Sequence, residues 1–121
     1  MVKKVMIVDD EEDIRLSVGQ IFEVDGYEVI SANDGNDCLE KIAHTIPDIV
    51  LLDIMMPGLN GWDVAARLKE HAEWKTIPIV FLTAKGDDMS IGMGSLASEE
   101  YIVKPFDIMQ LKEKVDEILS R

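Results

Sequence analysis

Cysteine and long apolar runs are scarce in the sequence. The single cysteine, Cys38, cannot form an internal disulfide, which fits a reducing cytosol. No apolar run approaches the roughly 20 residues that a membrane-spanning helix needs. The amino-terminal residues lead directly into an apolar strand and do not resemble a signal peptide. We therefore expect a cytoplasmic protein that makes no use of a membrane.

Basic residues are also few, because 12 Lys and Arg stand against 24 Asp and Glu and give a formal net charge of −12. Phosphate backbones repel so acidic a surface, so we expect no direct binding to nucleic acid. The 121 residues suffice for one domain with one core. A content of 47% hydrophobic and 30% charged residues is ordinary for a globular protein. We expect a single domain over residues 1–121.

Strand-like and helix-like segments alternate along the chain. Short apolar runs bounded by turn residues predict strands at 5–8, 28–31, 49–52, 79–82 and 101–103. Apolar residues at helical spacing predict helices at 12–24, 36–43, 62–71, 87–96 and 107–119. Two glycines weaken the fourth helix, and Asp107 is the expected N-cap of the last. This alternation predicts an α/β fold: a flavodoxin-like, doubly wound parallel sheet of five strands in the order 2-1-3-4-5, with five helices on both faces.

Polar residues stand at the ends of four of these strands. A lone Asp after a strand, such as Asp53, most often only begins a turn. The carboxyl ends of parallel strands, however, meet at one edge of the sheet, where ligands bind. We therefore expect one cluster that contains Asp9, Asp10, Asp53, Thr83 and Lys104.

The chemistry of this cluster favours phosphate. Three neighbouring carboxylates repel one another unless a proton or a cation neutralises them. Hard oxygen ligands without Cys or His suit Mg²⁺. The ammonium of Lys104 and the hydroxyl of Thr83 would suit the oxygens of a phosphoryl group. The pattern predicts an acyl phosphate formed by attack of an aspartate carboxylate.

Four segments carry a resemblance to a known family: residues 8–10, 52–61, 77–84 and 101–106, of which the first reads Val8-Asp9-Asp10. On these segments the chain resembles the receiver domains of two-component response regulators and is similar to their chemotaxis regulators. The resemblance covers essentially all 121 residues. It implies a phosphoprotein that takes phosphate from a sensor histidine kinase or a phosphotransfer protein, as in a phosphorelay, and acts on a downstream protein target or effector domain.

The resemblance also implies roles for single residues. Asp53 would be the phosphoacceptor, and Asp10 a Mg²⁺ ligand with Asp9 reaching the metal directly or through water. Asp53 itself and the backbone carbonyl of Met55 would complete the protein's share of the coordination. Such a domain takes part in its own phosphorylation and dephosphorylation but is not an enzyme in the usual sense.

The resemblance further implies that Thr83 and Lys104 would bind phosphoryl oxygens. Tyr101 would be the aromatic switch that turns inward as the threonine moves to the phosphate. The surface of the fourth helix, fifth strand and fifth helix would then present a new face to a partner. The bond before Pro105 is often cis in such domains. Met55 and Lys85 occupy positions that tune hydrolysis of the acyl phosphate, and a methionine cannot orient water strongly, so we expect slow self-dephosphorylation.

Two other functions stay open on the sequence. A small phosphatase with an aspartate nucleophile would need a second acid two residues after Asp53, where Met55 stands. A protein-interaction module on the same fold would need no phosphate. Since only two residues follow the last predicted helix, we expect a receiver that acts alone, the alternative being an effector domain beyond this segment.

Overall fold

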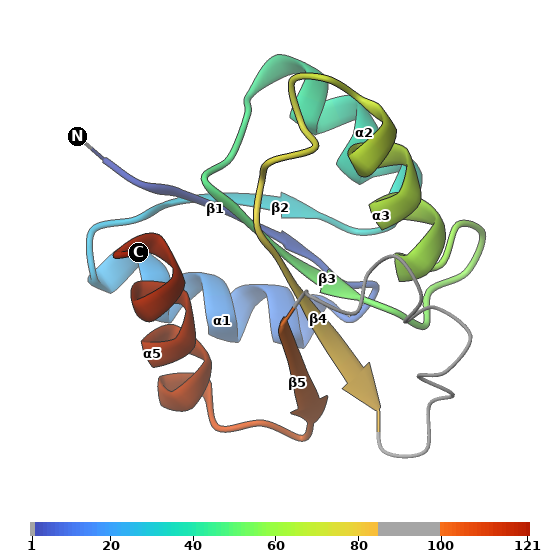
Figure 1. The fold of residues 1–121 in the computed structure, drawn as a ribbon. Coiled ribbons are helices and arrows are strands. Elements are labelled where there is room, and N and C mark those ends of the chain that lie inside the picture. The colour runs from blue at the N-terminus through green and yellow to red at the C-terminus, as the bar shows by residue number, and fades with distance from the viewer. Residues whose placement is uncertain (1, 85–99) are drawn as a thin grey trace.

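The structure is a computed structural model and describes residues 2–84 and 100–121. Its strands are β1 (Lys4–Val8), β2 (Glu28–Ala32), β3 (Ile49–Asp53), β4 (Ile79–Ala84) and β5 (Glu100–Lys104). Its helices are α1 (Glu12–Val24), α2 (Gly35–His44), α3 (Gly61–Glu70) and α5 (Ile108–Leu119). The strands form one parallel sheet in the order β2-β1-β3-β4-β5, as predicted (Figure 1).

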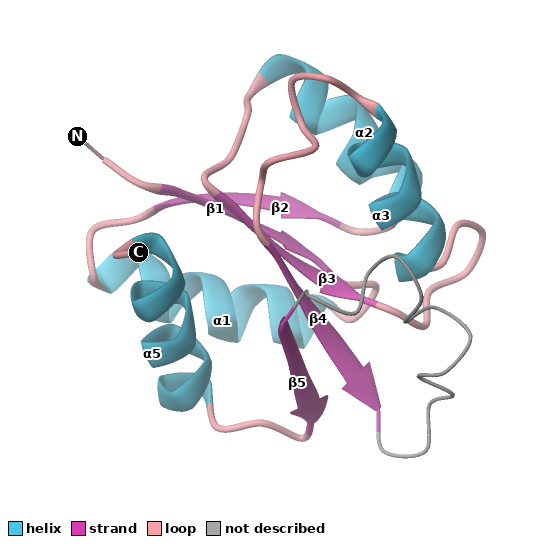
Figure 2. Cartoon of the chain, viewed as in Figure 1, coloured by secondary structure: helices cyan, strands magenta, loops and turns pink. Residues whose placement is uncertain are grey.

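Helices cover both faces of the sheet, with α1 and α5 on one side and α2 and α3 on the other (Figure 2). Each central strand is a continuous apolar run, and its residues alternate between the two layers, because successive side chains of a strand point to opposite faces. In β3, Ile49 and Leu51 pack with Phe22 of α1, whereas Val50 and Leu52 pack with Leu68 of α3. The sheet therefore lies between two buried layers.

Side-chain caps fix where three of the helices begin. The carboxylate of Asp34 accepts the N–H of Asp37 at the start of α2. Asn60 and Asp63 form a reciprocal capping box at the start of α3. Asp107 accepts the N–H groups of the first turn of α5, which confirms it as the N-cap.

The described strands and helices agree with the predicted ones to within a residue or two at most ends. The helix predicted at 87–96 lies outside the described residues, and so does Lys85. The Lys104–Pro105 peptide bond is cis, as the resemblance implied. Within residues 2–84 and 100–121, no helix has the length and apolar character to span a membrane.

Candidate functional site

The register of the sheet brings together strand ends that are distant in sequence. Val8 pairs with Leu52 across β1 and β3, so the residues that follow, Asp9 and Asp53, leave the sheet side by side. Asp53 in turn pairs with Leu82 of β4. Ala84, at the end of β4, pairs with Lys104, at the end of β5. Asp9, Asp53, Thr83 and Lys104 therefore share the carboxyl edge of the sheet.

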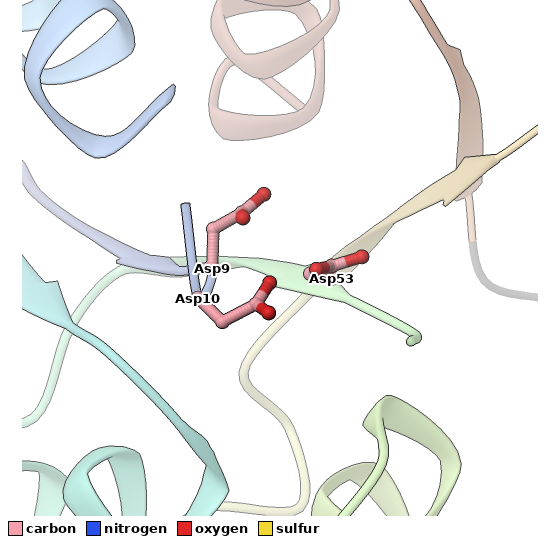
Figure 3. Close-up of side chains that lie close together, drawn as sticks. All are labelled: Asp9, Asp10 and Asp53. Atoms are coloured by element: carbon pink, nitrogen blue, oxygen red, sulfur yellow. The ribbon is translucent and has the colours of Figure 1, made fainter. Parts of the chain in front are cut away.

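Three carboxylates meet at this edge. An oxygen from each of Asp9, Asp10 and Asp53 lies within 4.8 Å of the others. Figure 3 shows Asp10, from the loop after β1, turned toward Asp53 at the end of β3. Asp9 and Asp53 are buried, with 0% and 4% of their surface exposed, while Asp10 is open to solvent. The cluster can thus be reached from solvent on the side of Asp10.

Lys104 supplies the positive charge that faces this cluster. Its Nζ donates to Asp9 Oδ2 at 2.9 Å and lies 3.5 Å from Asp53 Oδ1. Burial opposes the charged ammonium, but the hydrogen bond to Asp9 and the charge of Asp53 outweigh it and raise the pKa of Lys104 above its usual value. Lys104 is therefore a fixed cation beside the Asp53 carboxylate.

One cation does not balance the buried acids around Asp53. Burial, followed by the negative charge of Asp9, raises the pKa of Asp53 from 3.8 to about 7, although Lys104 works in the opposite direction. The charge of Asp10 adds to the rise. At neutral pH the negative charge of the site therefore exceeds the positive charge of Lys104. An ion or a proton that neutralises Asp53 would stabilise the site.

The donor set fits a magnesium ion. The three clustered side chains are all carboxylates, and neither His nor Cys is among them. Mg²⁺ prefers hard oxygen ligands and usually keeps several waters, which the exposed side at Asp10 would admit. Asp9, Asp10 and Asp53 are thus the side chains that could hold Mg²⁺.

The remaining predicted residues lie around this cluster. Thr83 is buried in β4, one position beyond the residue that pairs with Asp53. Met55 lies in the loop after β3, with 63% of its surface exposed. Tyr101 is partly buried in β5, where it pairs with Phe81 of β4. Val103, two residues further along β5, pairs with Thr83. The fold thus brings all the predicted residues to the ends or the flank of four neighbouring strands.

Two residues in contact with the site were missed by sequence reasoning. Glu11 is not part of the predicted cluster, yet its Oε1 lies 3.8 Å from Lys104 Nζ. Gly61 packs so tightly that a Cβ there would lie 2.5 Å from the Asp53 carbonyl oxygen. Asn60, which precedes Gly61, is a residue type common at N-caps, so the sequence indicated a helix start here. It did not indicate that Gly61 would lie so close to the Asp53 carbonyl.

The response regulator receiver domain family matches residues 5–116 of the chain. The chain belongs to this family. Receiver domains are the phosphorylation-dependent signalling domains of two-component systems.

Known relatives agree with this assignment. The receiver domain is 37% identical to the alkaline phosphatase synthesis transcriptional regulatory protein PhoP of Bacillus subtilis, over 100% of this chain and 50% of that protein. It is 36% identical to a solved CheY-like response regulator receiver domain protein of Methanospirillum hungatei, with a TM-score of 0.87 over 98% of this chain and 94% of that one. The chain spans about half the length of the curated relatives that it matches.

Proposed function

We propose that Asp53 of this receiver domain accepts a phosphoryl group from a phosphohistidine on a sensor kinase or phosphotransfer protein. An Asp53 oxygen attacks phosphorus, a P–O bond forms, and the P–N bond to the donor histidine breaks. The observation that carries the proposal is the position of Asp53 at a strand end, 3.5 Å from the ammonium of Lys104 and clustered with Asp9 and Asp10.

Lys104 and Thr83 would stabilise the charge of the phosphoryl group. Lys104 Nζ already lies within reach of Asp53, so a phosphoryl oxygen on that carboxylate would find a preorganised cation. Thr83 follows the residue that pairs with Asp53, and its hydroxyl is a suitable donor for a second oxygen. Their role is electrostatic, because in phosphoryl transfer the protein mainly positions groups and offsets charge.

The acidic cluster supports a magnesium site made of Asp9, Asp10, Asp53 and the backbone carbonyl of Met55. Bound there, Mg²⁺ would offset the charge of the carboxylates and of the phosphoryl oxygens. Without an ion, the neighbouring carboxylates of Asp9 and Asp10 oppose the ionisation of Asp53. Phosphorylation should accordingly require a divalent cation.

Phosphate on Asp53 would then bias a conformational switch through Thr83 and Tyr101. Thr83 directly follows Leu82, the β4 residue that pairs with Asp53, and Tyr101 lies on the adjacent strand. The output surface would comprise the predicted helix at 87–96, β5 and α5, and would bind a downstream protein target or an effector domain. The domain would work in the cytoplasm and touch neither membranes nor nucleic acid itself.

Phosphate uptake tests the proposal directly. Acetyl phosphate with Mg²⁺ should add one phosphoryl group per chain by intact mass, and Asp53→Asn should abolish the addition. Asp13→Asn, an exposed acid in the first turn of α1, serves as the matched control and should be labelled normally. Continuous release of phosphate would instead indicate a hydrolase, and a complete lack of reaction would favour an interaction module that needs no phosphate.

The lifetime of the acyl phosphate separates an acceptor from a hydrolase. Met55 offers no strong hydrogen bond to an attacking water, so the phosphorylated protein should decay slowly. Met55→Asn should shorten the lifetime, measured as loss of the phosphorylated mass after the donor is removed. An unchanged lifetime would show that this position does not control hydrolysis here.

A further inference from the structure

Three aromatic rings form a contact cluster next to the proposed switch residue. The ring of Tyr101 lies on Phe81 in a stacked geometry, with a centroid distance of 5.2 Å and an interplanar angle of 19°. Trp62 of α3 contacts Phe81 at 4.7 Å and Tyr101 at 6.1 Å, both in tilted geometry. These distances fall in the range at which aromatic pairs attract one another beyond simple burial. Trp62 is therefore a second aromatic contact of Tyr101, in addition to Phe81.

The backbone that carries Trp62 is attached to the end of β3. The N–H of Gly61 donates to the carbonyl of Ile54 at 2.7 Å, and the absence of a Cβ lets Gly61 pack against the Asp53 carbonyl. The capping box of Asn60 and Asp63 fixes the same helix start. The backbone that carries the indole is therefore anchored beside the acceptor, which limits how far Trp62 can move with Tyr101.

We propose that Trp62 is a positioning residue of the switch, which stabilises the inward position of Tyr101 and so sets how readily the domain responds to phosphate. This inference rests on the proposed function, in which inward Tyr101 accompanies phosphate on Asp53. Because linkage is reciprocal, whatever favours inward Tyr101 also favours the phosphorylated state. The loss of one aromatic contact corresponds to about a two- to tenfold change in that equilibrium.

Titration with beryllofluoride, a phosphoryl mimic, in the presence of Mg²⁺ measures the coupling. Trp62→Leu should weaken the apparent affinity about two- to tenfold, whereas Trp62→Phe, which keeps a ring, should recover part of the loss. Trp74→Leu is the control, because the ring of Trp74 stacks on His71, and it should leave the affinity unchanged. Circular dichroism verifies that each variant is folded.

A double substitution decides whether the effect passes through Tyr101. In a Tyr101→Ala background, Trp62→Leu should no longer change the affinity for beryllofluoride. An equal loss in both backgrounds would overturn the inference, since Trp62 would then act on the site by another route. The inference would also be overturned if Trp62→Leu did not change the affinity for beryllofluoride in the parent protein.

Fluorine NMR of the unliganded protein separates this inference from the proposed function. With 3-fluorotyrosine incorporated, the Tyr101 resonance is assigned by its loss in Tyr101→Phe. Trp62→Leu should shift that resonance clearly more than Trp74→Leu does, and equal shifts would refute the contact in solution. If Asp53 bound no phosphoryl mimic, the proposed function would fail while this measurement still tested the position of Tyr101.

Discussion

Replacing Asp53 by Asn should stabilise the metal-free protein at pH 8, although it removes the proposed acceptor. Burial and the charge of Asp9 raise the pKa of Asp53 from 3.8 to about 7, so above pH 7 the folded protein holds a carboxylate that its surroundings disfavour. At about 1.36 kcal/mol per pKa unit this corresponds to about 4 kcal/mol. We expect Asp53→Asn to raise the free energy of unfolding by about 2 to 4 kcal/mol at pH 8.

The direction of the pKa shift determines how the stability difference between the wild-type protein and Asp53→Asn changes with pH. A carboxyl whose pKa is raised on folding favours the folded state below its unfolded pKa, 3.8, and this contribution is lost as the pH rises to about 7. The wild-type protein should therefore lose stability between pH 4 and pH 7 relative to Asp53→Asn. The advantage of the variant should shrink toward pH 5 and stay constant above about pH 8.

Urea unfolding in EDTA, followed by circular dichroism between pH 5 and pH 8.5, measures both quantities. Asp13→Asn is again the control, because this acid is exposed, and it should change stability by no more than about 0.5 kcal/mol. Adding Mg²⁺ should stabilise the wild-type protein more than Asp53→Asn. A variant less stable than wild type at pH 8, or an advantage equally large at pH 5, would refute the electrostatic argument.

Three further substitutions test other parts of the structure. Lys104→Met should slow phosphate uptake from acetyl phosphate about a hundredfold or more, by intact mass over time, whereas Lys114→Met, which removes an ion pair with Glu100, should not. Gly61→Ala should cost about 2 to 3 kcal/mol in urea unfolding, because its Cβ would meet a backbone carbonyl at 2.5 Å. Asp107→Ala should cost about 1 kcal/mol by the same measurement, because α5 loses its N-cap.

Each of these predictions has an outcome that contradicts it. Uptake by Lys104→Met at the wild-type rate would mean that the ammonium does not stabilise the transferred group. Wild-type stability of Gly61→Ala would show that the start of α3 can move away from the end of β3. An Asp107→Ala protein as stable as the parent would show that other groups satisfy the first turn of α5.

Local sequence determined the elements and the direction of each strand. Apolar runs such as residues 49–52, followed by Asp53, predict a buried strand that ends in a polar residue, and the structure has β3 at Ile49–Asp53. Asp107 predicted the start of α5, because a cap acts on N–H groups two or three residues away. Alternation of the two kinds of element then predicted the order of the strands, since crossover rules leave few topologies.

Only the tertiary structure decided the distances and the energies at the site. Asp9 and Lys104 are 95 residues apart, and their 2.9 Å hydrogen bond depends on the register of four strands. The raised pKa of Asp53 depends on burial and on neighbouring charges, and the contact of Trp62 with Tyr101 depends on how α3 packs. Sequence patterns encode neighbours along the chain, whereas these quantities arise between segments that meet only after folding.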